Sequence, residues 1–399
     1  MRRRPLLTTC LLLLCSLARA GDALFPVPVD GKWGFIDKTG KVVITPSLDA
    51  LGHCVRRVFT TDLAPVKRDG KWVYIDRAGK VVLRVAADLP VRDGGPFVEG
   101  LARVSVGRIR LGDIGRITTG YIDRTGAFVI PPRFVAARDF SDGLAAVRLP
   151  PRRGCYVDKT GKVIVKDCGY AYDFKDGRAL VRLDGAAGGQ WGLIDKTGKM
   201  TVKFPKAERV RPFSEGLAAF FKPPKWGYLD RSGKVVVKPQ FHFAEDFHDG
   251  CASVWSEKPA PQPPKKRNRF ECRFIDKSGK FVTAQAFDAA FPFRDGRAAV
   301  QVGGKWGYLD TRGELAVPAR FDSAGPFAEG LAAVKADGKV VYIDPVGKVA
   351  VQPKDKVVFG AAFNQGLAPV HLPDGRRGYI DKAGRLVYAW TVAQPVFDD

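Results

Sequence analysis

The chain has 399 residues, of which 65 are Lys or Arg and 42 are Asp or Glu, so its formal net charge is +23. Its apolar content of 45% excludes an intrinsically disordered protein, and its 44 Gly and 28 Pro indicate many turns. The positive surplus favours polyanion partners, such as nucleic acid, acidic polysaccharide or anionic lipid headgroups, although it would serve solubility equally well.

The first 20 residues have the pattern of a secretory signal peptide. Arg2, Arg3 and Arg4 precede an apolar stretch at 6–17, and Ala18-Arg19-Ala20 fits the small-residue cleavage site. We therefore expect cleavage before Gly21 and a secreted, periplasmic or envelope location, with an uncleaved anchor as the alternative. No later stretch is apolar enough over a sufficient length to span a membrane.

One unit recurs down the rest of the chain. It is first seen as KWGFIDKTGK at 32–41 and returns in near copies such as KWGYLDRSGK at 225–234. Each copy has an Asp followed three residues later by a Gly. The ten Asp residues are Asp37, Asp76, Asp123, Asp158, Asp195, Asp230, Asp276, Asp310, Asp344 and Asp381. Fixed self-similarity of this kind is typical of repeat architectures.

A second element lies between these copies: a Phe, two residues, a Gly and a small apolar strand, as in PFSEGLAAF at 212–220. Short Val-, Phe- and Tyr-rich runs bounded by Gly, Pro or Asp predict strands. We therefore predict an all-β tandem array of about ten antiparallel three-stranded meander repeats over residues 21–399. Insertions interrupt it at 106–119 and 257–270, and residues 387–399 would cap its C-terminal end.

The sequence leaves two arrangements of this array open. Most copies are 34 to 39 residues apart, which is short for the four-stranded blades of a propeller, and ten blades exceed the usual number. We therefore expect an open or superhelical array, with one or two closed β-propellers as the alternative.

The repeated Asp and Gly fit a turn better than a reactive site. Asp favours the first position of a type I turn and Gly the fourth, where a left-handed backbone closes the hairpin. Ten equivalent acids on turns are poorly suited to acid–base catalysis, and their basic neighbours disfavour calcium. The histidines in FHFAEDFHDG at 241–250 show no spacing that defines a metal site. We predict no enzyme activity, no catalytic residues, no metal and no cofactor.

The Trp-Gly pairs are interpreted as packing residues. Since Gly in a strand marks a close approach, we expect the Trp of one copy to lie on the bare backbone of another. The alternative is a row of indoles that binds carbohydrate or choline, but five copies lack the Trp.

Basic residues follow the turn Asp in eight copies and the turn Gly in eight copies. If the copies stack, these residues form a basic edge that could bind a polyanion in a salt-sensitive way, although lysines also protect strand edges from pairing with other chains. The candidate edge residues are Lys38, Lys41, Arg77, Lys80, Lys159, Lys162, Lys196, Lys199, Arg231, Lys234, Lys277 and Lys280.

Five cysteines follow the signal peptide, and an oxidising compartment permits disulfides. Proximity in the sequence suggests Cys155–Cys168 and Cys251–Cys272, with Cys54 free. The absence of a C-x-x-C motif gives no support for a zinc site.

With its KWGFIDKTGK units, the chain resembles the WG-repeat (KWG-repeat) family of bacterial proteins over residues 30–388. The resemblance implies a β-rich repeat protein of the bacterial envelope or secretome, without a general enzymatic activity. We therefore expect an exported interaction or scaffold protein for envelope-protein or polyanion partners. A carbohydrate-binding module and an enzyme on a propeller scaffold remain as alternatives.

Overall fold

The computed structural model describes residues 23–391, except 57, 60, 87–89, 108–116, 151–152, 185–188 and 258–269. The predicted signal peptide (1–20), most of both insertions and residues 392–399 lie outside the described residues. The described part is all-β apart from one short 3₁₀ helix, His53–Val55, and contains no helix that could cross a membrane. The predicted array of meander repeats is confirmed.

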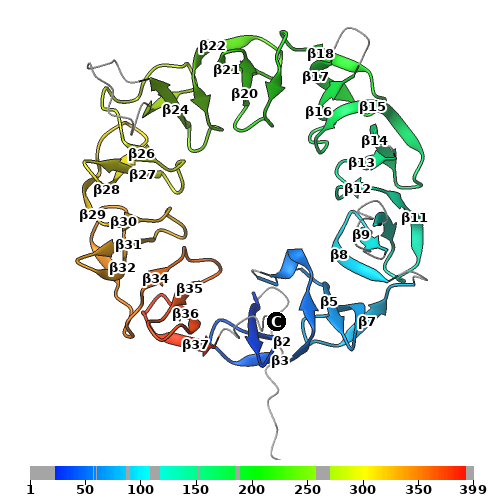
Figure 1. The fold of residues 1–399 in the computed structure, drawn as a ribbon, viewed down its shortest axis with the longest axis horizontal. Coiled ribbons are helices and arrows are strands. Elements are labelled where there is room, and N and C mark those ends of the chain that lie inside the picture. The colour runs from blue at the N-terminus through cyan, green and yellow to red at the C-terminus, as the bar shows by residue number, and fades with distance from the viewer. Residues whose placement is uncertain are drawn as a thin grey trace, which may run out of the picture.

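Nine antiparallel sheets follow one another along the described chain, and because the seven-stranded one comprises two repeat units, we divide them into blades 1 to 10 (Figure 1). Blade 1 is β1 (Phe25–Val29), β2 (Lys32–Ile36) and β3 (Val42–Leu48). Blade 2 is β4 (Ala50–Leu51), β5 (Ala64–Arg68), β6 (Lys71–Ile75) and β7 (Val81–Arg84). Blade 3 is β8 (Val91–Val98), β9 (Leu101–Val106), β10 (Thr118–Ile122) and β11 (Phe128–Phe134).

Blade 4 is β12 (Ala136–Ala137), β13 (Leu144–Leu149), β14 (Arg153–Asp158) and β15 (Val163–Ala171), which also pairs with blade 5. Blade 5 is β16 (Arg178–Leu183), β17 (Gln190–Asp195) and β18 (Met200–Lys203), and blade 6 is β19 (Arg209–Val210), β20 (Leu217–Lys222), β21 (Lys225–Asp230) and β22 (Val235–Phe241). Blade 7 is β23 (Phe243–Ala244), β24 (Cys251–Glu257) and β25 (Phe270–Asp276).

Blade 8 is β26 (Ala289–Ala290), β27 (Arg297–Val302), β28 (Lys305–Asp310) and β29 (Val317–Phe321). Blade 9 is β30 (Ser323–Ala324), β31 (Ala332–Ala336), β32 (Lys339–Ile343) and β33 (Val349–Val351), and blade 10 is β34 (Phe359–Gly360), β35 (Leu367–His371), β36 (Arg377–Asp381) and β37 (Leu386–Trp390). The three predicted strands of a repeat are thus the second, third and fourth of a blade. The first strand was missed because in seven blades it has only two residues, which is too short for a periodicity.

The blades form a closed ring, with first and second strands towards its centre and fourth strands along its outer edge (Figure 1). The Tyr379 hydroxyl in blade 10 donates to the Pro26 carbonyl in blade 1 at 3.1 Å. The Phe25 and Tyr379 rings are 5.5 Å apart, centroid to centroid. Of the two arrangements that the sequence left open, the structure therefore has the closed one. Residues 386–390 are the fourth strand of blade 10, against which blade 1 packs, and not a cap on an open end.

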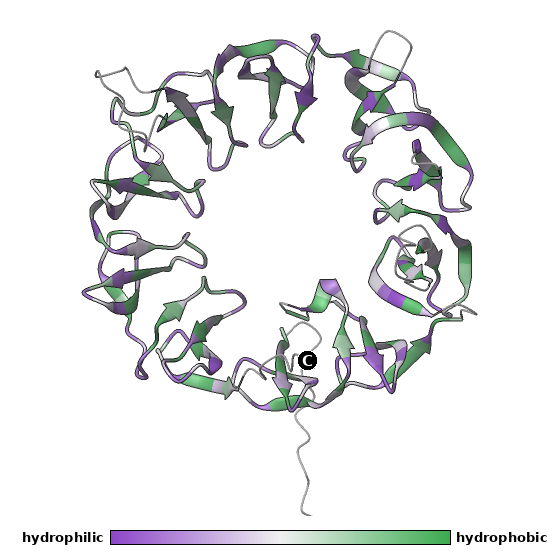
Figure 2. Ribbon diagram, viewed as in Figure 1, coloured by the Kyte–Doolittle hydropathy of each residue, from purple (hydrophilic) through white to green (hydrophobic). Residues whose placement is uncertain are grey.

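The ring has no single core. Its buried apolar residues fall into ten clusters, each between two neighbouring blades, and Figure 2 shows apolar residues spread around the whole ring. The tenth cluster joins Phe25, Val27 and Ile36 to Leu367 and Tyr379. Since no blade has a core of its own, each depends on both neighbours.

The Gly of each Asp-x-x-Gly turn also makes a contact between blades. Gly161 in blade 4 lies against Ile130 of blade 3, and Gly279 in blade 7 lies against Val237 of blade 6. A Cβ on Gly40 would lie 2.2 Å from the carbonyl oxygen of Val387, which is the same contact at the point of ring closure. These glycines also have φ near +85°, a left-handed backbone conformation that favours Gly. Both this conformation and the close approach of the neighbouring blade therefore require Gly here.

Candidate functional site

The Asp of the Asp-x-x-Gly turn, which we call the Asp turn, stabilises its own hairpin. In blade 4 one oxygen of Asp158 accepts from the Thr160 N–H at 2.9 Å, the Thr160 hydroxyl at 2.6 Å and the Lys162 N–H at 3.0 Å. The hydroxyl bond is the main reason why the pKa of Asp158 lies below its ordinary value. The predicted turn role of this Asp is confirmed.

A second set of acids links neighbouring blades. In blades 3 to 9 the turn before the second strand, which we call the acidic turn, has an Asp or Glu with φ near +50° followed by Gly. The Glu215 carboxylate of blade 6 accepts from the Gly250 N–H in blade 7 at 2.9 Å. The same bond joins the pairs Glu99–Gly143, Asp142–Gly177, Asp249–Gly296, Asp295–Gly330 and Glu329–Gly366.

Some of the predicted basic edge belongs to these links. Lys277, which follows the turn Asp of blade 7, forms an ion pair with Glu215 at 3.1 Å. Burial would raise the pKa of Glu215, but the bonds from Lys277 and Gly250 outweigh it and hold this pKa below its ordinary value. Lys159 pairs in the same way with Glu99, at 3.2 Å. These lysines join blades.

Two arginines of the predicted edge also contact the molecule itself. Arg77 donates to the carbonyl of Phe59 at 3.3 Å, and the Arg231 guanidinium lies 5.2 Å from the centroid of the Phe213 ring. Lys38 and Lys196 at the same repeat position are exposed.

The residues that follow the turn Gly are arranged differently. Because the hairpins of an antiparallel meander alternate between its two ends, all Asp turns and acidic turns lie on one face of the ring, which we call the turn face. On this face the six exposed residues Lys41, Lys80, Lys162, Lys199, Lys234 and Lys280 occur once per blade. Lys162, Lys199, Lys234 and Lys280 form no ion pair with a described residue.

The Trp side chains pack, as predicted, but the contact predicted for the Gly beside them is wrong. Trp191 is only 3% exposed and stacks on Tyr170 with ring centroids 5.5 Å apart. A Cβ on Gly34 would lie 2.5 Å from the carbonyl oxygen of Ile44, in the fourth strand of its own blade. That strand is bulged beside Trp33, so Gly makes room for the bulge and not for an indole from another copy.

Both predicted disulfides are contradicted, since all five described cysteines are free. Cys168 is paired with Gly154, so its side chain and that of Cys155 lie on opposite faces of the sheet, in different clusters. Cys251 is paired with Asp276, four residues from Cys272 along β25. Four residues of strand span about 13 Å, well beyond the reach of a disulfide.

The acids near the histidines are engaged elsewhere. Glu245 and Asp246 lie 2.8 and 3.6 Å from Arg211, and the His242 ring lies near the Lys225 ammonium. Within the described ranges, no group of three or more His, Cys, Asp or Glu is placed to hold a metal ion.

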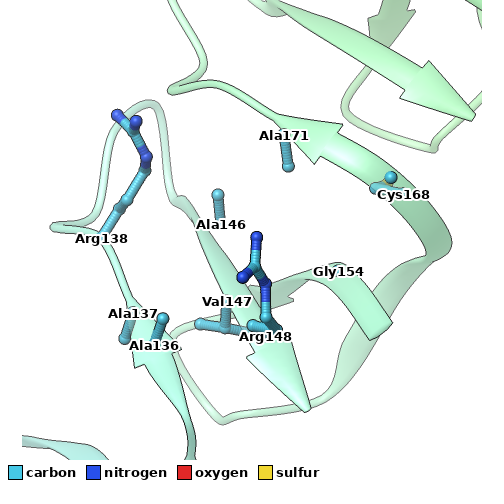
Figure 3. Close-up of a pocket in the computed structure, with 10 residues that line it drawn as sticks. Ala136, Ala137, Arg138, Ala146, Val147, Arg148, Gly154, Cys168 and Ala171 are labelled. Atoms are coloured by element: carbon cyan, nitrogen blue, oxygen red, sulfur yellow. The ribbon is translucent and has the colours of Figure 1, made fainter. Parts of the chain in front are cut away.

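Two cavities occur where a copy lacks an aromatic residue of the repeat. In blade 4 Gly154 stands at the Trp position, and a cavity of about 180 Å³ opens over Ala136, Ala146, Gly154 and Ala171 (Figure 3). In blade 5 Leu193 stands two residues before the turn Asp, where most copies have Tyr. There a cavity of about 560 Å³, which we call the junction cavity, lies between blades 5 and 6. Volumes of 300–1,000 Å³ are typical of ligand sites.

The sequence profile of the family described as WG containing repeat matches residues 33–72, 120–149, 156–185, 191–222, 226–254, 273–306 and 306–339. These matches cover more than half of the chain. The chain is a WG-repeat protein. No curated protein matches it. The predicted resemblance is thus confirmed, and in this WG-repeat protein the repeats form a closed ring of ten blades.

Solved structures similar to the WG-repeat ring share only a distant fold likeness. The designed Ika8 protein is 15% identical, with 65% of this chain and 86% of that chain covered and a TM-score of 0.34. AztD from Citrobacter koseri is 12% identical, with 63% and 79% covered and a TM-score of 0.32. BamB from Moraxella catarrhalis is 11% identical, with 78% and 96% covered and a TM-score of 0.33.

Proposed function

We propose that this WG-repeat protein is an exported, non-enzymatic scaffold that binds a polyanionic partner on its turn face. The observation that carries the proposal is the row of exposed lysines that follow the turn Gly, one in each of several consecutive blades. A regular row of exposed cations suits a partner with regularly spaced negative charges, whose binding releases counterions.

The acids on the same face reduce this attraction less than their number suggests. They lie on the turns between first and second strands, nearer to the ring centre (Figure 1). Six of them accept a hydrogen bond from a Gly N–H of the next blade, and Glu99, Glu215 and Glu329 also have a lysine partner. This engagement also supports a non-enzymatic role, because these acids serve as links between blades.

Heparin chromatography of the protein without residues 1–20 tests the polyanion proposal. The triple variant K162Q/K199Q/K234Q removes three charges from adjacent blades of the turn face. The control K71Q/K222Q/K339Q removes three exposed charges from the opposite ends of blades. We expect the first variant to elute at clearly lower salt than the wild type, while the control stays close to it. Equal shifts for both variants, or retention that is independent of salt, would refute the proposal.

Export has its own test. N-terminal sequencing of the protein recovered from the periplasm or medium should begin at Gly21, as the small-residue cleavage pattern predicts. Recovery of the intact chain from the cytoplasm alone would contradict export and leave the heparin result unaffected.

A further inference from the structure

The aromatic residue two positions before the turn Asp forms the same contact at nine of the ten blade junctions. Its ring meets an aromatic ring of the next blade with centroids 4.8 to 5.6 Å apart. At seven junctions it is a Tyr whose hydroxyl donates to a backbone carbonyl of the next blade; these are Tyr74, Tyr121, Tyr156, Tyr228, Tyr308, Tyr342 and Tyr379.

Blade 5 departs from this pattern. Leu193 brings neither a ring for Phe213 of blade 6 nor a hydroxyl for the carbonyl of the next blade. One blade earlier, the Tyr156 hydroxyl donates to the carbonyl of Tyr172, and the Tyr172 N–H donates to the carbonyl of Leu180. The Arg211 N–H donates to the carbonyl of Ala219 in the same way, so the carbonyl without a hydroxyl partner here is that of Arg211.

A second link is missing at this junction. Asp176 makes no bond to a Gly of blade 6 among the described residues. The missing aromatic ring and hydroxyl and the missing acid–Gly bond thus coincide at the junction that holds the 560 Å³ cavity.

The junction cavity combines an apolar interior with a cationic mouth. Leu180 and Leu193 are 5% and 2% exposed, and Phe213 is half-buried beside them. Lys175, Arg178 and Arg231 also line the cavity, and their side chains form no ion pair with a described residue. The one acid of the lining, Asp173, is paired with Arg138 at 3.1 Å. The cavity therefore has an excess of positive charge and an apolar wall.

We propose that the junction cavity binds a small aromatic acid, with its ring in the place that a Tyr ring occupies at seven other junctions. The ring would pack on Leu193 and Phe213, and a phenolic hydroxyl would donate to the Arg211 carbonyl next to Pro212 in the lining. The carboxylate would meet Lys175, Arg178 and Arg231, which have no ion pair with a described residue, at the mouth. The ligand thus supplies the ring and the hydroxyl that blade 5 lacks, together with a negative charge for the cations.

Isothermal titration with 3-(4-hydroxyphenyl)propionate tests this site. We expect saturable binding to the wild type, about five- to tenfold weaker binding of 3-phenylpropionate, which lacks the hydroxyl, and at least tenfold weaker binding of neutral 4-ethylphenol. No saturable binding of the hydroxyphenyl acid at millimolar concentration would overturn the proposal, as would equal binding of the neutral phenol.

The substitution Leu193→Tyr makes the test specific to the cavity, because it restores the repeat residue and fills the site from within. We expect loss of binding together with a higher thermal midpoint, which shows that the variant is folded. Phe274→Tyr is the matched control, since it adds the same hydroxyl at the same repeat position where a ring already packs on Phe293. Binding that survives Leu193→Tyr, or that is lost equally in Phe274→Tyr, would place the ligand elsewhere.

Discussion

Closure of the ring depends on a contact that a single methyl group should disrupt. Gly40 in the Asp turn of blade 1 lies on Val387 in the last strand of blade 10, and a Cβ there would be 2.2 Å from the Val387 carbonyl oxygen. Gly31 is the matched control. It has a similar φ, +74° against +88°, but a Cβ on it would meet nothing within 4 Å. The substitutions Gly40→Ala and Gly31→Ala therefore differ mainly in the collision with the neighbouring blade.

Gly40→Ala has two energetic costs, and Gly31→Ala has only the first of them. A non-Gly residue in the left-handed region costs about 1–3 kcal/mol, and both variants bear this cost. Gly40→Ala also has to move the Val387 backbone by more than 1 Å to reach an ordinary contact of 3.4 Å or more. Forcing a packed contact apart in this way costs about 1–3 kcal/mol more. Because blade 1 has no core of its own, this additional cost falls on the junction of blades 10 and 1.

Hydrogen exchange with peptide resolution measures where each cost appears. In Gly40→Ala we expect faster exchange both in β1–β3 and in β34–β37, which lie at opposite ends of the chain but share a junction. In Gly31→Ala the change should stay within the hairpin of β1 and β2. If both variants gave the same exchange pattern, or if blade 10 were unaffected by Gly40→Ala, the argument that this contact closes the ring would be wrong.

Three further predictions concern the repeated contacts. Tyr228→Phe removes the hydroxyl bond to the Glu245 carbonyl at 2.7 Å and should lower the free energy of unfolding by about 1–3 kcal/mol. Tyr170 is 55% exposed, so Tyr170→Phe should change the free energy of unfolding by no more than about 0.5 kcal/mol. The pKa of Asp158 and of several other turn acids is lowered in the folded state, so the stability they provide is present above the unfolded pKa near 4 and is lost as the pH falls through the lower folded value. The thermal midpoint should thus fall between pH 5 and pH 3, and an unchanged midpoint would contradict this. Burial raises the pKa of Cys272 to about 12, so iodoacetamide at pH 8 should label it only after unfolding, and intact mass should be the same with and without reductant.

Much of the fold could be predicted because the residues that form each turn are present in each repeat. Asp at the start and Gly at the end of a hairpin are local requirements, and ten copies make them unmistakable. Closure could not be predicted in the same way, because it depends on how a small rotation between neighbouring blades adds up over ten junctions. No local sequence pattern indicates this total rotation. In the structure, the contact of Gly40 in blade 1 with Val387 in blade 10 shows that the ring closes.

The two wrong disulfides have a related cause. Separation in sequence suggested that Cys155 and Cys168 are close, and the strands that bear them are indeed neighbours. Pairing alone does not bring two thiols together, since a shift by one residue moves a side chain to the other face of the sheet. Register depends on the bulge in β15, which single-sequence patterns do not reveal.

The acids of the acidic turns were visible in the sequence but their role was missed. An Asp or Glu precedes Gly in seven copies, as in Glu215-Gly216 and Asp249-Gly250. The partner of each acid is a Gly N–H in the next repeat, about 35 residues away, as between Glu215 and Gly250. Recurrence in seven copies was the available signal, because a residue that recurs in different local sequences is required by something those copies share, which is a neighbouring blade.

The same reasoning shows where a specific function would lie in such a ring. Residues that recur in most copies are used by the contacts between blades, as the hydroxyl of Tyr228 and the carboxylate of Glu215 are. A departure that only weakened a junction would lower stability, and departures from a consistent pattern are expected mainly at functional or strained sites. At the junction of blades 5 and 6, Leu193 replaces the aromatic residue of the repeat, and Asp176 makes no bond to a Gly of the next blade among the described residues. The same junction has an apolar cavity with cations at its mouth, as expected if it is kept open for a ligand.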